Sequence, residues 1–111
     1  MDSTRQEKIG RMLQKELSSM FLGIARNYPG VMITVTNVRI TPDLSIVKVY
    51  LSIFPGDKAE STLALIKEHS KTIRYELGVK IRHQMRVVPE LAFYLDDTLD
   101  YLENIDKLLK K

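Results

Sequence analysis

The chain has 111 residues, of which 44% are hydrophobic and 28% are charged, so it corresponds to about one ordinary domain with enough apolar side chains to bury a core. It contains no cysteine, which excludes a disulfide framework and thiolate metal sites and favours a reducing compartment. The opening residues carry no apolar leader and no apolar run reaches membrane-spanning length, so we expect a soluble, cytoplasmic protein with no membrane partner.

Residues 3–25 have the pattern of a long amphipathic helix. Its apolar positions, spaced by three and four, are Ile9, Met12, Leu13, Leu17, Met20, Phe21 and Ile24. The Tyr28-Pro29-Gly30 sequence is expected to end the helix. Lys8, Arg11 and Lys15 fall within a narrow arc opposite the apolar stripe. A solvated face and an RNA contact explain this arc equally well.

Two β-branched segments follow and predict an antiparallel hairpin. In residues 31–41 the apolar alternation slips at Asn37, which indicates a bulge or a bent strand. Residues 41–45 have the composition of a turn. Residues 46–54 return as a second strand with Val47, Val49, Leu51 and Ile53 on one face. Lys48, Tyr50 and Ser52 are therefore expected on the other face.

Residues 58–78 have a helical pattern that is interrupted around His69-Ser70-Lys71 and that we expect to stop at Gly78, so one bent helix or two successive helices fit. A third strand is predicted after Pro89, which cannot donate to a sheet ladder and so suits the entrance of the strand. In this strand Leu91, Phe93 and Leu95 should face the core, and Tyr94 should face the other way. A strand, a helical crossover and another strand favour parallel, right-handed pairing.

Thr98 to Leu109 has the pattern of a short terminal helix. The predicted order is therefore α-β-β-α(α)-β-α, with no internal repeat and no linker. We expect residues 1–111 to form a single α+β domain in which helices cover a three-stranded sheet.

The net charge of +3 is unevenly distributed. Residues 67–86 contain six basic residues against two acids, as a surface that contacts a phosphate backbone would. Solvated helix faces often look the same. With the arc of the first helix, the candidate RNA-binding residues are Lys8, Arg11, Lys15, Lys71, Arg74, Lys80, Arg82 and Arg86.

No motif in the chain indicates catalysis. His69 and His83 lack the further ligands that a metal site needs, and helix capping explains the acids that follow the third strand. Phosphate-binding glycine loops and nucleophile motifs are absent from the sequence. We therefore expect a monomer that is not an enzyme and that needs no cofactor or metal.

Four segments resemble the ribosome-binding factor A family, and the resemblance spans nearly the whole chain. They are RQEKIGRMLQKELSSMF, TVTNVRITPDLSIVKVYLSIF with Thr41-Pro42-Asp43-Leu44 at its turn, IRYELG and VVPELAFYLDD. The resemblance implies a KH-like fold of the second type (type II). It also implies a factor that binds the small (30S) ribosomal subunit and its rRNA, assists late maturation of 16S rRNA and supports growth in the cold. Ribosomal proteins are further candidate contacts.

The chain departs from that family at the bend between the two middle helices. The family joins this helix pair by an Ala-centred kink, whereas the chain has His69-Ser70-Lys71. A histidine and a lysine at this position would add phosphate contacts. Two functional classes remain open: an RNA-binding assembly factor, and a protein-interaction module with a KH-like fold and no specific RNA role.

Overall fold

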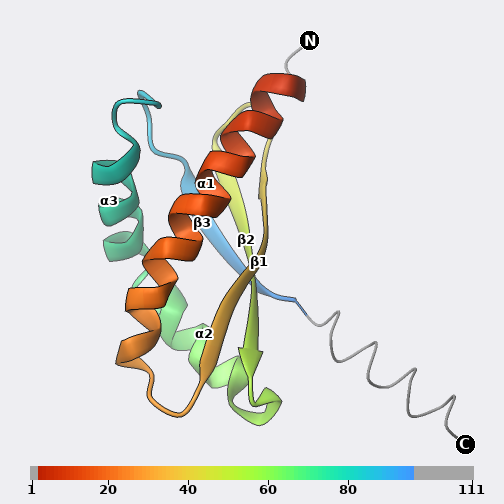
Figure 1. The fold of residues 1–111 in the computed structure, drawn as a ribbon, viewed down its shortest axis with the longest axis vertical. Helices are drawn as coiled ribbons and strands as arrows, with labels where there is room; N and C mark the ends of the chain where they lie inside the picture. Colours follow the sequence, from red (N-terminus) through yellow and green to blue (C-terminus); the bar gives the residue numbers. More distant parts are fainter. Residues whose placement is uncertain (1–2, 97–111) are drawn as a thin grey trace, which may run out of the picture.

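The computed structural model describes residues 3–96, and Figure 1 shows their arrangement. The elements are α1 (Ser3–Ile24), a 3-10 turn (Ala25–Asn27), β1 (Met32–Ile40), β2 (Ile46–Phe54), a second 3-10 turn (Gly56–Lys58), α2 (Ala59–Glu68), α3 (Ser70–Ile81) and β3 (Glu90–Leu95). The predicted order and the α+β class are confirmed over this range. The expected terminal helix lies outside the described residues. Among the described helices, none is long and apolar enough to cross a membrane.

The sheet has the order β1-β2-β3. β1 and β2 pair antiparallel, and the register shifts between Val35 and Asn37, which confirms the predicted bulge. β2 and β3 pair in parallel, as expected for strands joined by a helical crossover. The Thr36 hydroxyl, within the bulge, donates to the Asp96 carboxylate at 2.5 Å. This contact joins the two edges of the sheet across β2.

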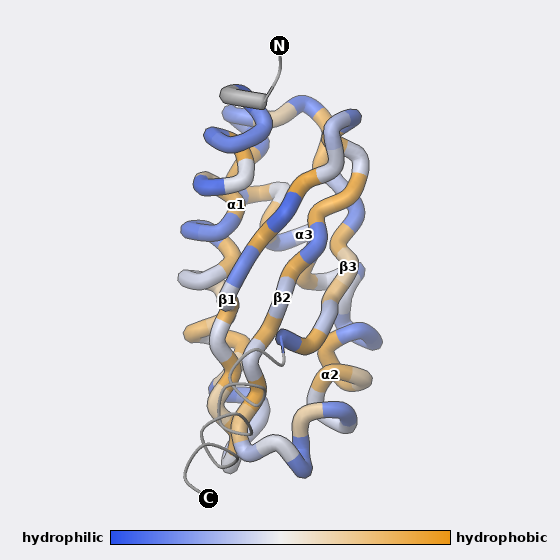
Figure 2. The backbone as a smooth tube through the Cα atoms, turned by 90° about the vertical axis from the view of Figure 1, so that its right-hand side faces the viewer, coloured by the Kyte–Doolittle hydropathy of each residue, from blue (hydrophilic) through white to orange (hydrophobic). Residues whose placement is uncertain are grey.

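The three helices of the described residues lie on one face of the sheet. Figure 2 shows the strands toward the viewer, with the helices beside and behind them. The core contains the predicted inward faces of α1, β1 and β2, and Phe21 meets Phe93 edge-on at a ring-centroid distance of 6.1 Å. Phe93 is 3% exposed and Tyr94 is 43% exposed, so the predicted faces of β3 are confirmed.

The hairpin turn is held by Asp43. Its carboxylate accepts hydrogen bonds from the hydroxyls of Thr41 and Ser45, each at 2.7 Å, and from the Ser45 amide at 3.2 Å. The Thr41 bond, followed by those from Ser45, holds the pKa of Asp43 below its ordinary value. Leu44 adopts a positive φ of 63°, and its amide donates to the Thr41 carbonyl. The turn that the sequence predicted is therefore present.

The helical pair bends at a single residue, His69, as the interrupted pattern predicted. Its amide donates to the carbonyls of Leu65 and Ile66, and its own carbonyl accepts from Ile73. The bend is therefore hydrogen-bonded on both sides.

The prediction that Gly78 ends the second helix is wrong, because α3 continues to Ile81. Leu77 and Ile81 are fully buried, so the inward stripe of α3 runs past the glycine and packing holds the last turn. Gly78 instead allows a close approach. A Cβ at this position would lie 2.8 Å from Cγ2 of Val88, in the segment that leads into β3.

Candidate nucleic-acid interface

The outer side of α3 carries a basic stripe. Burial of Ile73, Leu77 and Ile81 fixes which side of α3 faces the core, so residues offset from them point toward solvent. A hollow of about 700 Å³ follows this side; we call it the α3 hollow, and it is lined by Lys71, Arg74, Tyr75, Gly78, Val79, Arg82 and Val88. The structure thus brings together three of the predicted cations, spread over twelve positions of the sequence.

Arg74 has a structural role that the sequence did not reveal. Its Nε donates to the Pro89 carbonyl at 3.0 Å and its Nη2 donates to the Val88 carbonyl at 2.6 Å. The guanidinium therefore ties the segment before β3 to α3. Because Arg has five N–H donors, three remain for another partner, and the side chain is exposed. Arg74 supports the α3 hollow as well as contributing charge to it.

Apolar side chains stand among these cations. Tyr75 is 73% exposed and Val79 is 51% exposed, and both line the α3 hollow. An exposed aromatic ring beside lysine and arginine suits RNA, because an unpaired base can stack on the ring while the cations contact phosphates. Tyr75 and Val79 are not among the candidate residues predicted from the sequence. Their positions in the helical repeat could have indicated that they are exposed, since neither belongs to the inward stripe of α3.

The other predicted cations do not line the α3 hollow. Lys80 and Arg86 are exposed, on α3 and on the segment before β3 respectively. Lys8, Arg11 and Lys15 are exposed along α1, so the predicted set divides between two regions of the molecule.

A smaller hollow of about 210 Å³ lies beside the helix bend. Lys67 and Ser70 line it on the helical side, and residues 91–94 of β3 line it on the strand side. Since β3 is an edge strand, this bend hollow borders backbone groups that no further strand pairs within the described residues. Lys67 was part of the basic run in the sequence but was not among the candidate residues.

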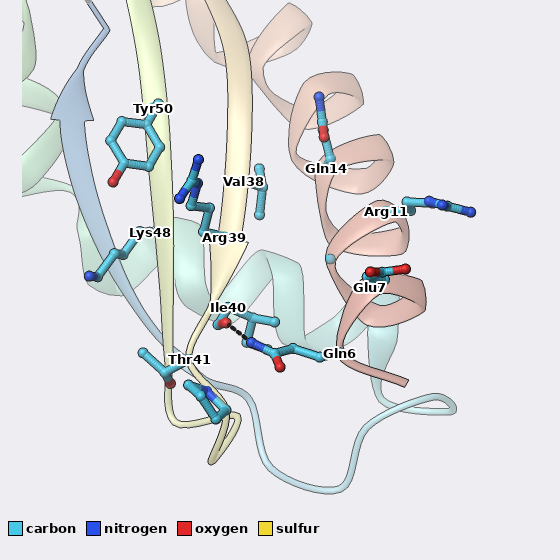
Figure 3. A pocket seen from close by; sticks show the side chains of 12 residues that line it. Gln6, Glu7, Arg11, Gln14, Val38, Arg39, Ile40, Thr41, Lys48 and Tyr50 are labelled. Carbon is cyan, nitrogen blue, oxygen red and sulfur yellow. Dashed lines mark hydrogen bonds between the residues drawn. The ribbon is translucent and has the colours of Figure 1, made fainter. Parts of the chain in front are cut away.

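A third hollow, of about 610 Å³, follows the edge of β1, and we call it the β1-edge hollow. It contains Arg11 together with Arg39, Lys48 and Tyr50 from the sheet. In Figure 3 Arg11 extends from α1 away from the strands, while Gln6 reaches β1 and its Nε2 donates to the Ile40 carbonyl at 2.7 Å.

Within the described residues, the groups whose pKa is shifted lie outside the linings of the three hollows. Burial, and then the charge of Glu68, raise the pKa of Tyr28, but Tyr28 lines none of the three hollows. Within residues 3–96, no group of three or more histidines and acids is arranged to hold a metal ion. The side chains that line the three hollows include lysines, arginines, glutamines and tyrosines.

Comparisons with known proteins agree on one family. The model of the family described as ribosome-binding factor A matches residues 5–109. A protein of that name from Cytophaga hutchinsonii is 45% identical over 112 residues, which cover 100% of this chain and 84% of the relative. The namesake from Flavobacterium johnsoniae is 44% identical, over 98% of this chain and 85% of the relative.

A solved structure has a similar fold. The crystal structure of ribosome-binding factor A from Thermus thermophilus superposes with a TM-score of 0.69 at 22% sequence identity, over 81% of this chain and 94% of that chain. At this identity the likeness concerns the fold, and it confirms the predicted KH-like arrangement.

Proposed function

The chain belongs to the ribosome-binding factor A family, and from this premise we propose that it binds the small (30S) ribosomal subunit through its rRNA. It assists late maturation of 16S rRNA and matters most at low temperature. It acts as a monomer in the cytoplasm, and it works by binding and not by catalysis.

The observation that carries this proposal is the α3 hollow. Lys71 and Arg82 present cations along one side of it, and the exposed ring of Tyr75 lies between them in the sequence. Cations that contact phosphates set the position of a protein on RNA, and an unpaired base supplies the partner for the ring. A concave surface with both kinds of group suits a folded rRNA region with unpaired bases better than it suits a regular duplex.

A binding protein assists RNA maturation when it prefers one RNA conformation over its competitors. It shifts the equilibrium by its differential affinity for the two states and by no more. A tenfold preference corresponds to about 1.4 kcal/mol. Loss of a phosphate contact therefore reduces this preference when the contact is stronger in the favoured conformer than in its competitors.

The test is affinity for purified small subunits across a salt series. Each phosphate contact that is lost should flatten the slope of log affinity against log salt by roughly 0.7 to 0.9, because fewer counterions are released. We therefore expect Lys71→Ala with Arg82→Ala to weaken binding and flatten the slope. Arg74 stays unchanged in this test, because its loss would also release the segment before β3.

The matched control is Arg26→Ala with Lys58→Ala. It removes one exposed arginine and one exposed lysine that line none of the three hollows. Equal losses in test and control would mean that general positive charge is responsible. If neither pair of substitutions changes the affinity and binding persists at high salt, the alternative function, a protein-interaction module, is favoured.

A further inference from the structure

The face of the sheet opposite the helices carries its own set of side chains. We call it the open face; among the described residues no helix covers it (Figure 2). Burial of Val38, Val47 and Val49 on the helical side places their strand neighbours on the open face. The open face thereby receives Arg39 from β1, Lys48 and Tyr50 from β2, and Ala92 and Tyr94 from β3.

Two of these side chains are like charges placed directly opposite each other. Arg39 pairs with Lys48 in the β1–β2 register, and Lys48 pairs with Ala92 in the β2–β3 register. Like charges in directly opposite positions destabilise a sheet. Sheet stability therefore does not account for this row. A bound anion would relieve the repulsion, and both side chains line the β1-edge hollow, where Figure 3 shows them on the same side of β1.

The next row on the same face is aromatic. Tyr50 and Tyr94 are register partners, and their rings stack with centroids 5.5 Å apart and an interplanar angle of 26°. Rows on one face of a sheet repeat every two residues, roughly 6 to 7 Å along the strands. A cationic row therefore lies one step from an aromatic platform, on which an unpaired base can stack.

We propose that the open face is a second RNA-binding surface, which takes unpaired nucleotides: Arg39 and Lys48 contact phosphate, and the Tyr50–Tyr94 pair stacks on a base. This proposal rests on the proposed function and adds a surface separate from the α3 hollow. The acids of the open face stand at its margins. Glu90 begins β3, and Asp96 follows the strand and accepts from a threonine hydroxyl. The centre of the face is therefore cationic and complementary to a phosphate backbone.

The stacked pair also has a purely structural explanation, because cross-strand aromatic pairs stabilise sheets. The two explanations differ in what they predict for RNA. A structural pair affects stability only, whereas a platform affects affinity for single-stranded RNA and leaves affinity for duplex RNA unchanged.

The experiment measures binding of the full chain to a short fluorescent oligouridylate and to a blunt RNA duplex. Tyr94→Ala should weaken oligouridylate binding by roughly 5- to 150-fold, the effect of one lost base stack, without changing duplex binding. Tyr94→Phe keeps the aromatic face and should bind like the unchanged protein. Arg39→Ala with Lys48→Ala should weaken binding of the oligouridylate and flatten the salt dependence of that binding.

A second readout does not depend on a destabilising variant. The chain has five tyrosines and no tryptophan, so stacking of uracil on the platform should quench tyrosine emission, and Tyr94→Phe should reduce the quenching while affinity is kept. Unchanged oligouridylate affinity in Tyr94→Ala overturns the proposal, as does the absence of quenching in the unchanged protein. The proposal is also overturned if polyglutamate displaces the fluorescent oligouridylate as well as unlabelled RNA does. That result would indicate an anion site without base contacts.

Failure of this inference can be told apart from failure of the proposed function. If small subunits bind and the Lys71 and Arg82 variant weakens that binding, while the open-face variants leave oligouridylate affinity unchanged, only the second surface is refuted. If the unchanged protein does not bind small subunits, the proposed function fails first.

Discussion

Replacing Gly78 by alanine sets two effects of opposite sign against each other. Within a helix, alanine is favoured over glycine by about 0.8 to 1.0 kcal/mol, and Gly78 lies inside α3. The added Cβ, however, would lie 2.8 Å from Cγ2 of Val88. Real Cβ contacts are essentially never this short, so one of the two segments must shift.

The structure indicates that the shift is costly. Valine is branched at Cβ and has little rotamer freedom, and the backbone around Val88 is held by the Arg74 hydrogen bonds and by buried Pro89. Overpacking of this kind typically costs about 1 to 3 kcal/mol. We therefore expect Gly78→Ala to lower the free energy of unfolding by about 0 to 2 kcal/mol. Helix propensity alone would predict an increase.

A double-mutant cycle isolates the contact. In a Val88→Ala background only the Cβ of residue 88 remains, 3.8 Å from the new methyl group, which is an ordinary van der Waals distance. There Gly78→Ala should stabilise the protein by up to about 1 kcal/mol. Urea unfolding followed by circular dichroism measures all four proteins. The same stabilisation by Gly78→Ala in both backgrounds would refute the argument from close approach.

Three other changes test the remaining structural assignments. Phe93→Ala should cost about 3 to 5 kcal/mol and Tyr94→Ala less, and the reverse ranking in chemical denaturation would contradict the faces assigned to β3. Arg74→Ala should cost about 1 to 2 kcal/mol, and Arg74→Lys nearly as much because lysine lacks the forked donor. Faster amide exchange in residues 85–88 is the measurement that checks this. Because the pKa of Asp43 is lowered in the folded state, its stabilising contribution is complete above its unfolded value and is lost as pH falls through the folded value. The stability difference between the unchanged protein and Asp43→Asn should narrow over that acidic range, and a difference that does not vary with pH would argue against a carboxylate role in the turn.

The strands could be predicted because their two faces meet different surroundings. In β2 the helices cover Val47 and Val49, while Lys48 and Tyr50 face the other way, so the alternation along the sequence records the burial. The slip at Asn37 was visible for the same reason, since a bulge moves every later side chain of β1 to the opposite parity.

Features that depend on contacts between distant segments were not visible in the sequence. The sequence pattern predicts a helix end at Gly78, whereas the glycine allows a close approach to Val88, which depends on where the segment before β3 returns to α3. The hydrogen bonds from Arg74 to the Val88 and Pro89 carbonyls depend on the same approach of that segment to α3. The stacking of Tyr50 on Tyr94 requires the parallel register. The RNA role of the candidate cations stays a prediction.

The hydrogen bond from Gln6 to the Ile40 carbonyl has a consequence for self-association. Within residues 3–96, β1 is an edge of the sheet, and exposed edges are templates on which another chain can add a strand. Gln6 occupies one acceptor of that edge, and the bulge at Val35 and Asn37 interrupts the straight register that an added strand would need. A strand that pairs along the whole of this edge must therefore displace the amide and flatten the bulge, and both requirements disfavour strand addition at β1.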